Sequence, residues 1–212
     1  ETIGSITYLS RNYEALRRNV VAGFNLTCMG DERAYSYLPS RKGDTLADKA
    51  ALHVLRHFAP DFIRYTFLDR ESDERQYCSP GIDLPLCSVM RSKYHVYPEY
   101  HTSLDDCSLV TQKGLEDSVN IMTHILEALE ENVVYEPRVL CEPQLGKRGL
   151  YPTLSTKTSC TEQVNLMMDL LAYADGNTTL LEEADIVGRD IFRCAETMRK
   201  LVEKDVLAIK KC

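Results

Sequence analysis

The residues best suited to chemistry gather in one stretch of the chain, residues 72–106. Within it, His101 follows a run of aromatic side chains and precedes two carboxylates, Asp105 and Asp106. An imidazole that binds a metal ion needs an acceptor for its second ring N–H and a wall that excludes water. The neighbours of His101 could supply both. A lone histidine in such a loop is more often structural, so spacing alone leaves a metal site and a structural role open.

Other reactive residues lack partners at a useful spacing. His53 and His57 lie four apart on one predicted helix, but apolar residues surround them and no glutamate completes a metalloprotease motif. His95 could approach the same site as His101, although its spacing fixes nothing. Cys78 has no obvious base nearby, which argues against a nucleophilic cysteine. The sequence contains no glycine-rich phosphate loop.

Strand and helix patterns alternate through the first part of the chain. Apolar residues recur at helical spacing in three segments, whereas three short apolar or alternating runs are typical of strands. The helical segments are residues 1–19, 44–59 and 115–129, and the strand segments are residues 20–26, 62–67 and 84–90. Strands separated by helices predict an α/β fold with a mostly parallel or mixed sheet flanked by helices.

The composition changes near Pro137. Residues 142–158 carry prolines and glycines with little periodicity and are interpreted as an ordered linker arm, in which Lys147 and Arg148 either bind an anion or, as we favour, staple two domains. Three short helical patterns and a β-type tail follow, which is the outline of a winged helix. We therefore expect an α/β domain with its arm in residues 1–157 and a winged helix in residues 158–212.

The segment around His101 resembles the closing motif of the co-catalytic zinc aminopeptidases and their glutaminyl-cyclase relatives. The matching parts are Ser72-Asp73, Tyr77, Gly81-Ile82, His101-Thr102-Ser103 and Asp105-Asp106, with Glu1–Ser5 and Asn25–Gly30 upstream. The likeness is closer to a narrower group of bacterial aminopeptidase-like proteins that carry ETIGSI, GFNLTC, YPEYHTS and CEPQLGKRGLYPT and end in a winged helix. The resemblance implies a partial three-layer zinc-exopeptidase-like domain, the C-terminal part of a longer protein.

Residue by residue, the resemblance implies an incomplete zinc site. Glu1 falls on the family's general base, and His101 falls on its closing zinc ligand. Thr2 and Thr27 stand where the classical enzymes keep carboxylate ligands, so the number of zinc ions, one or two, stays open. Asp31, four residues after Thr27, could replace a missing ligand; its other interpretation is an aspartate in a surface turn.

The function implied by the resemblance is a zinc-dependent aminopeptidase-type hydrolase. Water would cleave a peptide or another small amide-containing substrate, and the chain by itself would be inactive because the other ligands lie upstream. The alternative is a non-catalytic binding or regulatory protein on a degenerate aminopeptidase fold, linked to surface-polysaccharide biosynthesis. Thr2 and Thr27, together with Glu74 in place of a family histidine, favour that alternative.

Net charge, hydropathy and cysteine content restrict the kinds of partner and the compartment that we expect for this protein. The net charge is −7, and the third helix of the expected winged helix mixes Arg193, Arg199 and Lys200 with Asp190 and Glu196, so we expect protein contacts, within the chain or in a homo-oligomer, and no nucleic acid. No apolar run approaches the roughly 18 residues of a membrane helix. The eight cysteines are scattered without a CxxC pair, which favours reduced thiols and a cytoplasmic protein.

Overall fold

A computed structural model describes residues 2–150 and 157–210, with only the backbone described for residues 157–160. The chain forms two compact units, Glu1–Ile125 and Leu126–Cys212, and the division falls inside one helix, α4 (Gln112–Glu131). The boundary expected from the sequence, with the linker arm assigned to the first domain, lies later, between residues 157 and 158. Each unit is described by itself below.

The first unit is built on a four-stranded mixed sheet with the order β1-β4-β2-β3. Strand β1 (Gly23–Leu26) runs parallel to β4 (Leu86–Met90), and Gly23 pairs with Leu86. Strand β2 (Ser36–Leu38) is antiparallel to β4 and parallel to β3 (Ile63–Arg64). The predicted mixed α/β architecture is thereby confirmed.

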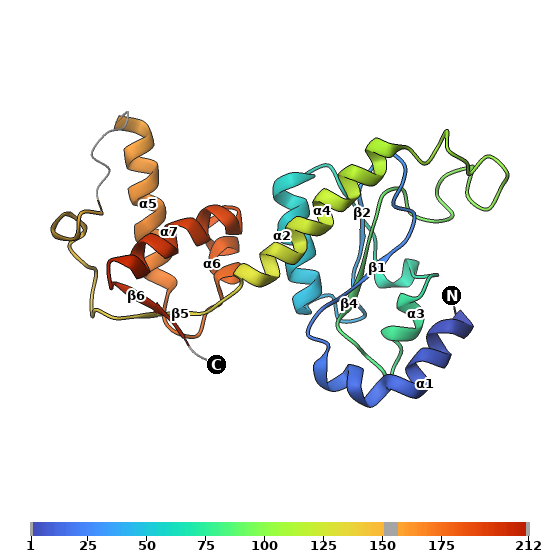
Figure 1. Ribbon diagram of the computed structural model, residues 1–212, viewed down its shortest axis with the longest axis horizontal. Helices are drawn as coiled ribbons and strands as arrows, with labels where there is room; N and C mark the ends of the chain where they lie inside the picture. The colour runs from blue at the N-terminus through green and yellow to red at the C-terminus, as the bar shows by residue number, and fades with distance from the viewer. Residues whose placement is uncertain (1, 151–156, 211–212) are drawn as a thin grey trace. The chain divides into compact units, whose positions relative to one another are not determined.

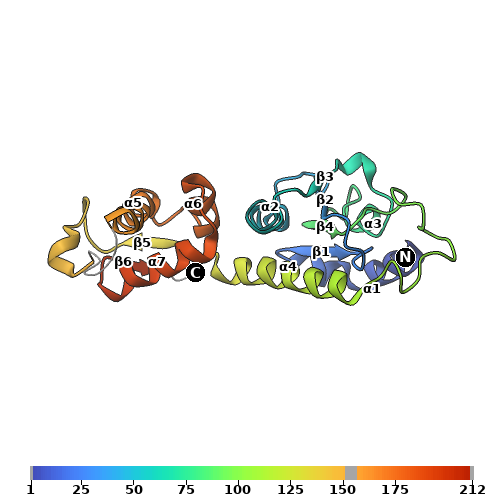
Figure 2. The ribbon, with the colours of Figure 1, turned by 90° about the horizontal axis from the view of Figure 1, so that it is seen from above.

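Helices cover both faces of this sheet. Helix α2 (Leu46–Phe58) lies on one face, and α3 (Glu74–Tyr77) with α1 (Thr2–Asn19) lies on the other (Figures 1 and 2). The side chain of Thr45 accepts a hydrogen bond from the backbone N–H of Asp48 at the start of α2. The side chain of Asp48 in turn accepts a hydrogen bond from the backbone N–H of Thr45, which completes a capping box. Pro60 follows the end of α2 and cannot continue it.

Short segments of this unit differ from the sequence prediction. The strand expected over residues 62–67 is limited to Ile63–Arg64, and a 3₁₀ turn begins at Phe67 and runs to Asp69. Asp69 accepts hydrogen bonds from the backbone N–H and the hydroxyl of Thr66, which favours that turn over an extended strand. Strand β2 was not expected, since three residues are too few to show an alternating pattern.

The second unit is a winged helix, as predicted. Helices α5 (Lys157–Tyr173), α6 (Leu180–Val187) and α7 (Ile191–Glu203) pack on one another beside a two-stranded antiparallel sheet. That sheet pairs β6 (Leu207–Ile209) with β5 (Tyr135–Pro137), a strand that precedes the linker arm. Gly188, with a φ of 66°, adopts the left-handed conformation that ends α6 before the tight turn into α7.

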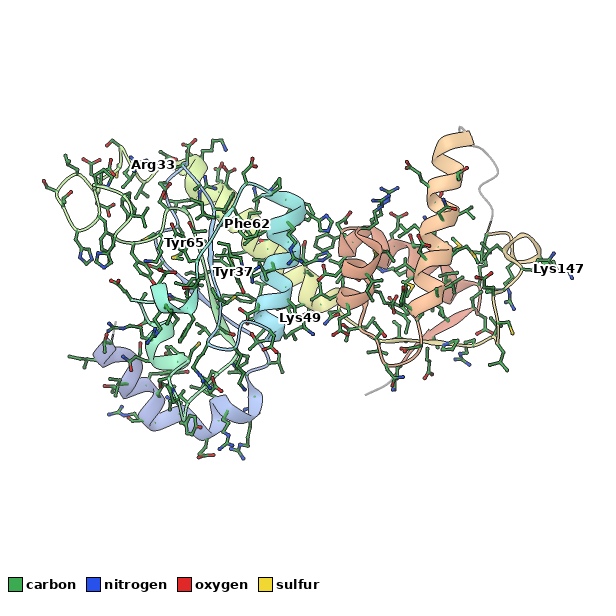
Figure 3. The ribbon with its side chains drawn as sticks, turned by 180° about the vertical axis from the view of Figure 1, so that it is seen from behind. Arg33, Tyr37, Lys49, Phe62, Tyr65 and Lys147 are labelled. Carbon is green, nitrogen blue, oxygen red and sulfur yellow. The ribbon has the colours of Figure 1, made fainter. Side chains whose placement is uncertain are left out.

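The basic pair of the linker arm lies in a 3₁₀ turn, Leu145–Arg148. Arg148 donates a hydrogen bond to the carbonyl of Lys204 just after α7, at 3.1 Å, so it ties the arm to the winged helix. Lys147 is exposed and projects outward (Figure 3). Among the described residues, no helix is both long and apolar enough to cross a membrane.

Candidate functional site

The carboxyl ends of β1 and β4 bring the candidate residues together. Because these strands are parallel, residues 27–31 after β1 and residues 91–111 after β4 emerge at the same edge of the sheet. Open α/β sheets bind ligands at this edge. His101 comes from the second segment, and Asp31 comes from the first.

A pocket of about 290 Å³ contains both His101 and Asp31. Its wall also includes Thr27, Cys28 and Asp105, along with Tyr97 and Tyr100. The structure thus gathers two of the three site residues proposed from the sequence. The third, Glu1, lies outside the described residues.

His101 is presented to solvent by a constrained loop. Its ring stacks on Tyr100, with ring centroids 3.9 Å apart. The ring of His95 lies 6.3 Å from that of His101, and its Nε2 contacts a carboxylate oxygen of Glu71 at 2.8 Å. His101 and His95 have φ values of 58° and 63°, and Cys28 of the same pocket region has 50°. Side chains with a Cβ rarely adopt this region, and such strain clusters at functional sites.

Asp31 is held firmly by protein donors. It is only 5% exposed, and its carboxylate accepts hydrogen bonds from the backbone N–H of Arg33 (2.9 Å) and from both the N–H (2.8 Å) and the hydroxyl (2.9 Å) of Ser92. Its carbonyl accepts a further bond from Nε of Arg91 at 2.7 Å. These contacts tie the turn after β1 to the chain after β4. Metal ligation by Asp31 stays a prediction. The contacts that the structure gives this side chain are those of a residue that fixes the turn after β1.

Glu74, which the resemblance aligns with a histidine of the classical enzymes, is fully buried. One carboxylate oxygen accepts from the backbone N–H groups of Glu71 and Ser72 (2.9 Å each) and from the hydroxyl of Tyr94 (2.7 Å). The other accepts from Asn25 at 2.8 Å and Ser88 at 3.3 Å. Glu74 therefore joins β1, β4 and the start of the loop that carries His101. This role leaves no local pattern in the sequence, because Asn25 and Ser88 lie far from Glu74 in the chain.

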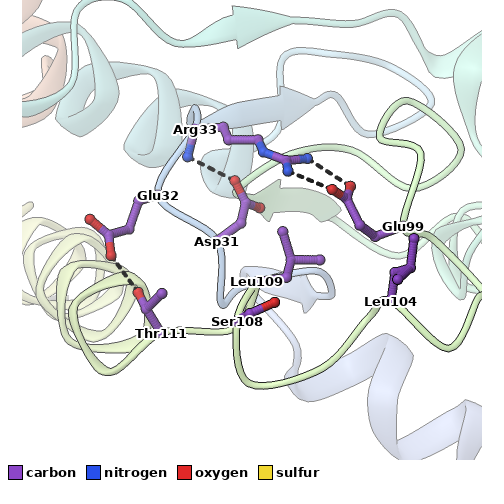
Figure 4. A pocket seen from close by; sticks show the side chains of 8 residues that line it. All are labelled: Asp31, Glu32, Arg33, Glu99, Leu104, Ser108, Leu109 and Thr111. Atoms are coloured by element: carbon purple, nitrogen blue, oxygen red, sulfur yellow. Dashed lines mark hydrogen bonds and ion pairs between the residues drawn. The ribbon is translucent and has the colours of Figure 1, made fainter.

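An ion pair fastens the same loop two residues before His101. Arg33 donates two hydrogen bonds to Glu99, at 2.9 and 2.8 Å, beside a pocket of about 430 Å³ (Figure 4). The Arg33 guanidinium lowers the pKa of Glu99 to about 2. Glu32 accepts a hydrogen bond from Thr111 at 2.6 Å on the other side of this pocket. The turn after β1 thus contacts the loop near its middle, at Glu99, and at its end, at Thr111.

Tyr97 closes the wall beside Cys28. Its hydroxyl lies 3.5 Å from both the Cys28 sulfur and a carboxylate oxygen of Asp105. Burial raises the pKa of Tyr97, so its hydroxyl stays protonated and can donate. Within the described part of the chain, no three histidine, cysteine, aspartate or glutamate side chains are gathered as a metal ion would require.

Comparison with known proteins adds independent findings. Residues 1–132 match the model of a family described as "Domain of unknown function (DUF4910)", and residues 133–209 match a winged helix-turn-helix model. A curated Clostridium acetobutylicum protein named "Putative polysaccharide biosynthesis protein with aminopeptidase-like domain" is 36% identical over 212 residues. That match covers 99% of this chain and 48% of the relative.

A solved structure gives the same picture. The crystal structure of a "putative peptidase" from Clostridium acetobutylicum superposes with a TM-score of 0.88 at 35% identity, covering 99% of this chain and 46% of that one. The chain therefore spans about half the length of these relatives. Its first unit has a peptidase-like fold, and a winged helix follows.

Proposed function

The chain belongs to the DUF4910 family, and from that premise we propose that the complete protein is a zinc-dependent hydrolase of the aminopeptidase type. The carrying observation is the pocket that holds His101 and Asp31 at the carboxyl edge of β1 and β4. The name of the relative, with its "aminopeptidase-like domain", supports the same activity class. The substrate class is a peptide or another small molecule with an amide bond.

The described residues fit part of a zinc site. His101 offers an exposed imidazole, and neutral imidazole is a common zinc ligand. The carboxylate of Asp31 is already engaged by three protein donors, and no third ligand is gathered beside them in the described residues. When bound, zinc lowers the pKa of a water molecule and polarises the amide carbonyl. We assign the remaining ligands to the part of the protein outside this chain.

This chain's own residues position the site. The Arg33–Glu99 pair and the Asp31–Ser92 bonds hold the loop of His101 against the turn after β1. The stacked rings of Tyr100 and His101 limit how the imidazole can rotate. Glu1 is proposed as the group that takes a proton from the attacking water.

The second candidate is a binding or regulatory protein that kept the fold and lost part of the metal set. Glu74 favours it: five protein donors engage this carboxylate where the classical enzymes place a histidine. Thr27, a residue of the pocket wall, offers a hydroxyl where those enzymes keep a carboxylate. The relative's name also mentions polysaccharide biosynthesis, so an amino-sugar amide is a ligand compatible with either candidate.

The winged helix is proposed to make protein contacts, within the chain or in a homo-oligomer. The cations of α7 are largely paired: Arg199 with Glu131, Lys200 with Glu196 at 2.7 Å, and Arg193 with Glu162 at 4.0 Å. A phosphate backbone would meet few free positive charges. The described cysteines for which a state is assigned carry free thiols, which suits the reducing cytoplasm we propose.

Metal analysis of the complete protein tests the proposal. We expect one or two zinc ions per chain, and His101→Ala should lower the content by about one equivalent. His57→Ala, which changes an exposed histidine on α2, is the matched control and should retain its zinc. A complete protein without zinc, even after incubation with the metal, would contradict the hydrolase and favour the binding protein.

A further inference from the structure

A separate pocket of about 540 Å³ lies where α2 ends and the chain enters β2. Its wall is rich in aromatic and aliphatic groups: Tyr35, Phe58, Pro60, Phe62 and Ile63. Glu32 and Arg33 line both this pocket and the pocket of Figure 4. Two of its lining residues, Arg33 and Phe62, are labelled in Figure 3. Apolar walls with a few convergent polar groups are typical of small-molecule sites.

Arg91 is the least exposed of the charged residues that line this pocket. It is 4% exposed, its Nε donates to the carbonyl of Asp31, and its guanidinium carbon lies 4.0 Å from the centroid of the Tyr35 ring. The Nη1 atom is buried, and no described residue accepts a hydrogen bond from it. A buried donor without an acceptor is costly, particularly on a charged group. An acceptor that entered from the pocket would remove that cost.

The charges of the wall restrict the acceptor. The wall carries two cations, Arg33 and Arg91, and two carboxylates, Glu32 and Asp61. Arg33 is already engaged by Glu99, whereas one nitrogen of Arg91 has no acceptor among the described residues. A single negative charge can pair with Arg91, but a dianion would also meet the two carboxylates. A planar carboxylate matches the guanidinium fork.

We propose that this pocket binds a small monoanionic carboxylate with an apolar body, whose carboxylate pairs with Arg91 and whose apolar body lies against Phe62 and Ile63. The bond from Arg91 to Asp31 connects this site to the turn that carries the candidate metal pocket. The proposal does not depend on the zinc hydrolase, because it needs only residues of the first unit.

Nuclear magnetic resonance titration of the chain with three probes tests the proposal. We expect 3-phenylpropanoate to give saturable shifts and 3-phenylpropanamide, its neutral analogue, to bind at least about tenfold more weakly, a difference of about 1.4 kcal/mol. Phenyl phosphate, a dianion, should also bind more weakly than the carboxylate. Equal affinity for acid and amide, tighter binding of the phosphate, or no saturable shift with any probe would overturn the proposal.

Variants at the pocket mouth locate the binding without disturbing buried Arg91. Ile63 is 45% exposed, so Ile63→Glu should fold and lower the affinity for 3-phenylpropanoate at least about tenfold by placing a like charge beside it. Leu68→Glu is the matched control: Leu68 is 85% exposed, is absent from the pocket wall, and should keep the affinity. Unchanged binding in Ile63→Glu would overturn the site.

Discussion

At the residue scale, the buried carboxylates in the described part of the chain divide into those that accept hydrogen bonds and one, Glu183, that does not. Glu74 and Asp31 each join separate segments through several hydrogen bonds. Glu183 of α6 is equally buried, yet neither of its oxygens has a hydrogen-bond partner among the described residues. The difference between a carboxylate that stabilises the fold and one that opposes it is therefore a matter of donors, not of burial.

Glu183 predicts a pH dependence of stability in the winged helix. Burial, and secondarily the charge of Asp175, raises the pKa of Glu183 to about 8 from its ordinary 4.5. The folded state therefore holds the proton more tightly than the unfolded state. This contribution is fully present below about pH 4.5 and is lost as the pH rises through about 8.

Glu183→Gln should remove this loss, because the amide stays neutral at every pH. At pH 9 we expect the variant to be more stable than the native chain by at least about 2 kcal/mol, and at pH 5 the two should be similar. Denaturant unfolding of the second unit, followed at several pH values, measures both. Parallel stability curves for the two proteins would contradict the assignment.

The candidate site could be predicted from the sequence only in part. The motif around His101 drew attention to the loop, and Asp31 was proposed because it follows Thr27 by four residues; the structure places both in the wall of one pocket. The roles of Glu74 and of the Arg33–Glu99 pair were not predictable, since their partners lie far away in the sequence. Long-range hydrogen bonds leave no periodic signal.

At the element scale, long amphipathic helices were predictable and short strands were not. Helix α4 extends to Gln112–Glu131, around the predicted 115–129, because its apolar residues repeat over many turns. Strand β5 (Tyr135–Pro137) had no comparable signal and is defined by its pairing with β6. Short strands depend on tertiary partners for their existence.

The start of α4 approaches the turn after β1 so closely that only glycine fits. A Cβ added at Gly114 would lie 2.0 Å from the carbonyl oxygen of Gly30 and 2.9 Å from that of Asp31. Both contacts are to backbone, which cannot rotate away. Gly114→Ala should therefore destabilise the first unit by about 2 kcal/mol or more and displace the Asp31 turn.

Gly4→Ala is the matched control for Gly114→Ala. Gly4 also lies within a helix, but a Cβ there would meet no atom within 4 Å. Alanine should stabilise α1 by about 0.5–1 kcal/mol. Thermal unfolding of both variants is the measurement, and a stable Gly114→Ala protein would contradict the close approach.

Helix α7 gives a prediction about nucleic acid. Its three ion pairs leave little free positive charge, so the field that a phosphate would feel is largely cancelled. We expect the chain to bind duplex DNA no more tightly than the roughly 10⁻⁶ M non-specific range at physiological salt. A gel-shift titration measures this, and tighter, sequence-dependent binding would contradict the protein-contact role.

At the scale of the whole molecule, the two units differ in what they need from the rest of the protein. The winged helix closes its own two-stranded sheet and buries an apolar interior that includes Leu180, Ile191 and Met198. The first unit, in contrast, leaves the outer edge of β1 without a paired strand within the described residues, and it provides one exposed imidazole at the candidate pocket. Its chemistry, as proposed, requires groups from the rest of the protein.

This requirement gives the final prediction, that the chain by itself hydrolyses no aminoacyl anilide. Catalytic zinc needs about three protein ligands and a water molecule, whereas the described residues gather no such set. Release of nitroaniline from leucine p-nitroanilide, measured with added zinc, should equal the rate without protein. The complete protein should hydrolyse the anilide and lose that activity with a chelator. Chelator-sensitive hydrolysis by this chain would place all the ligands within it and contradict the division of the site.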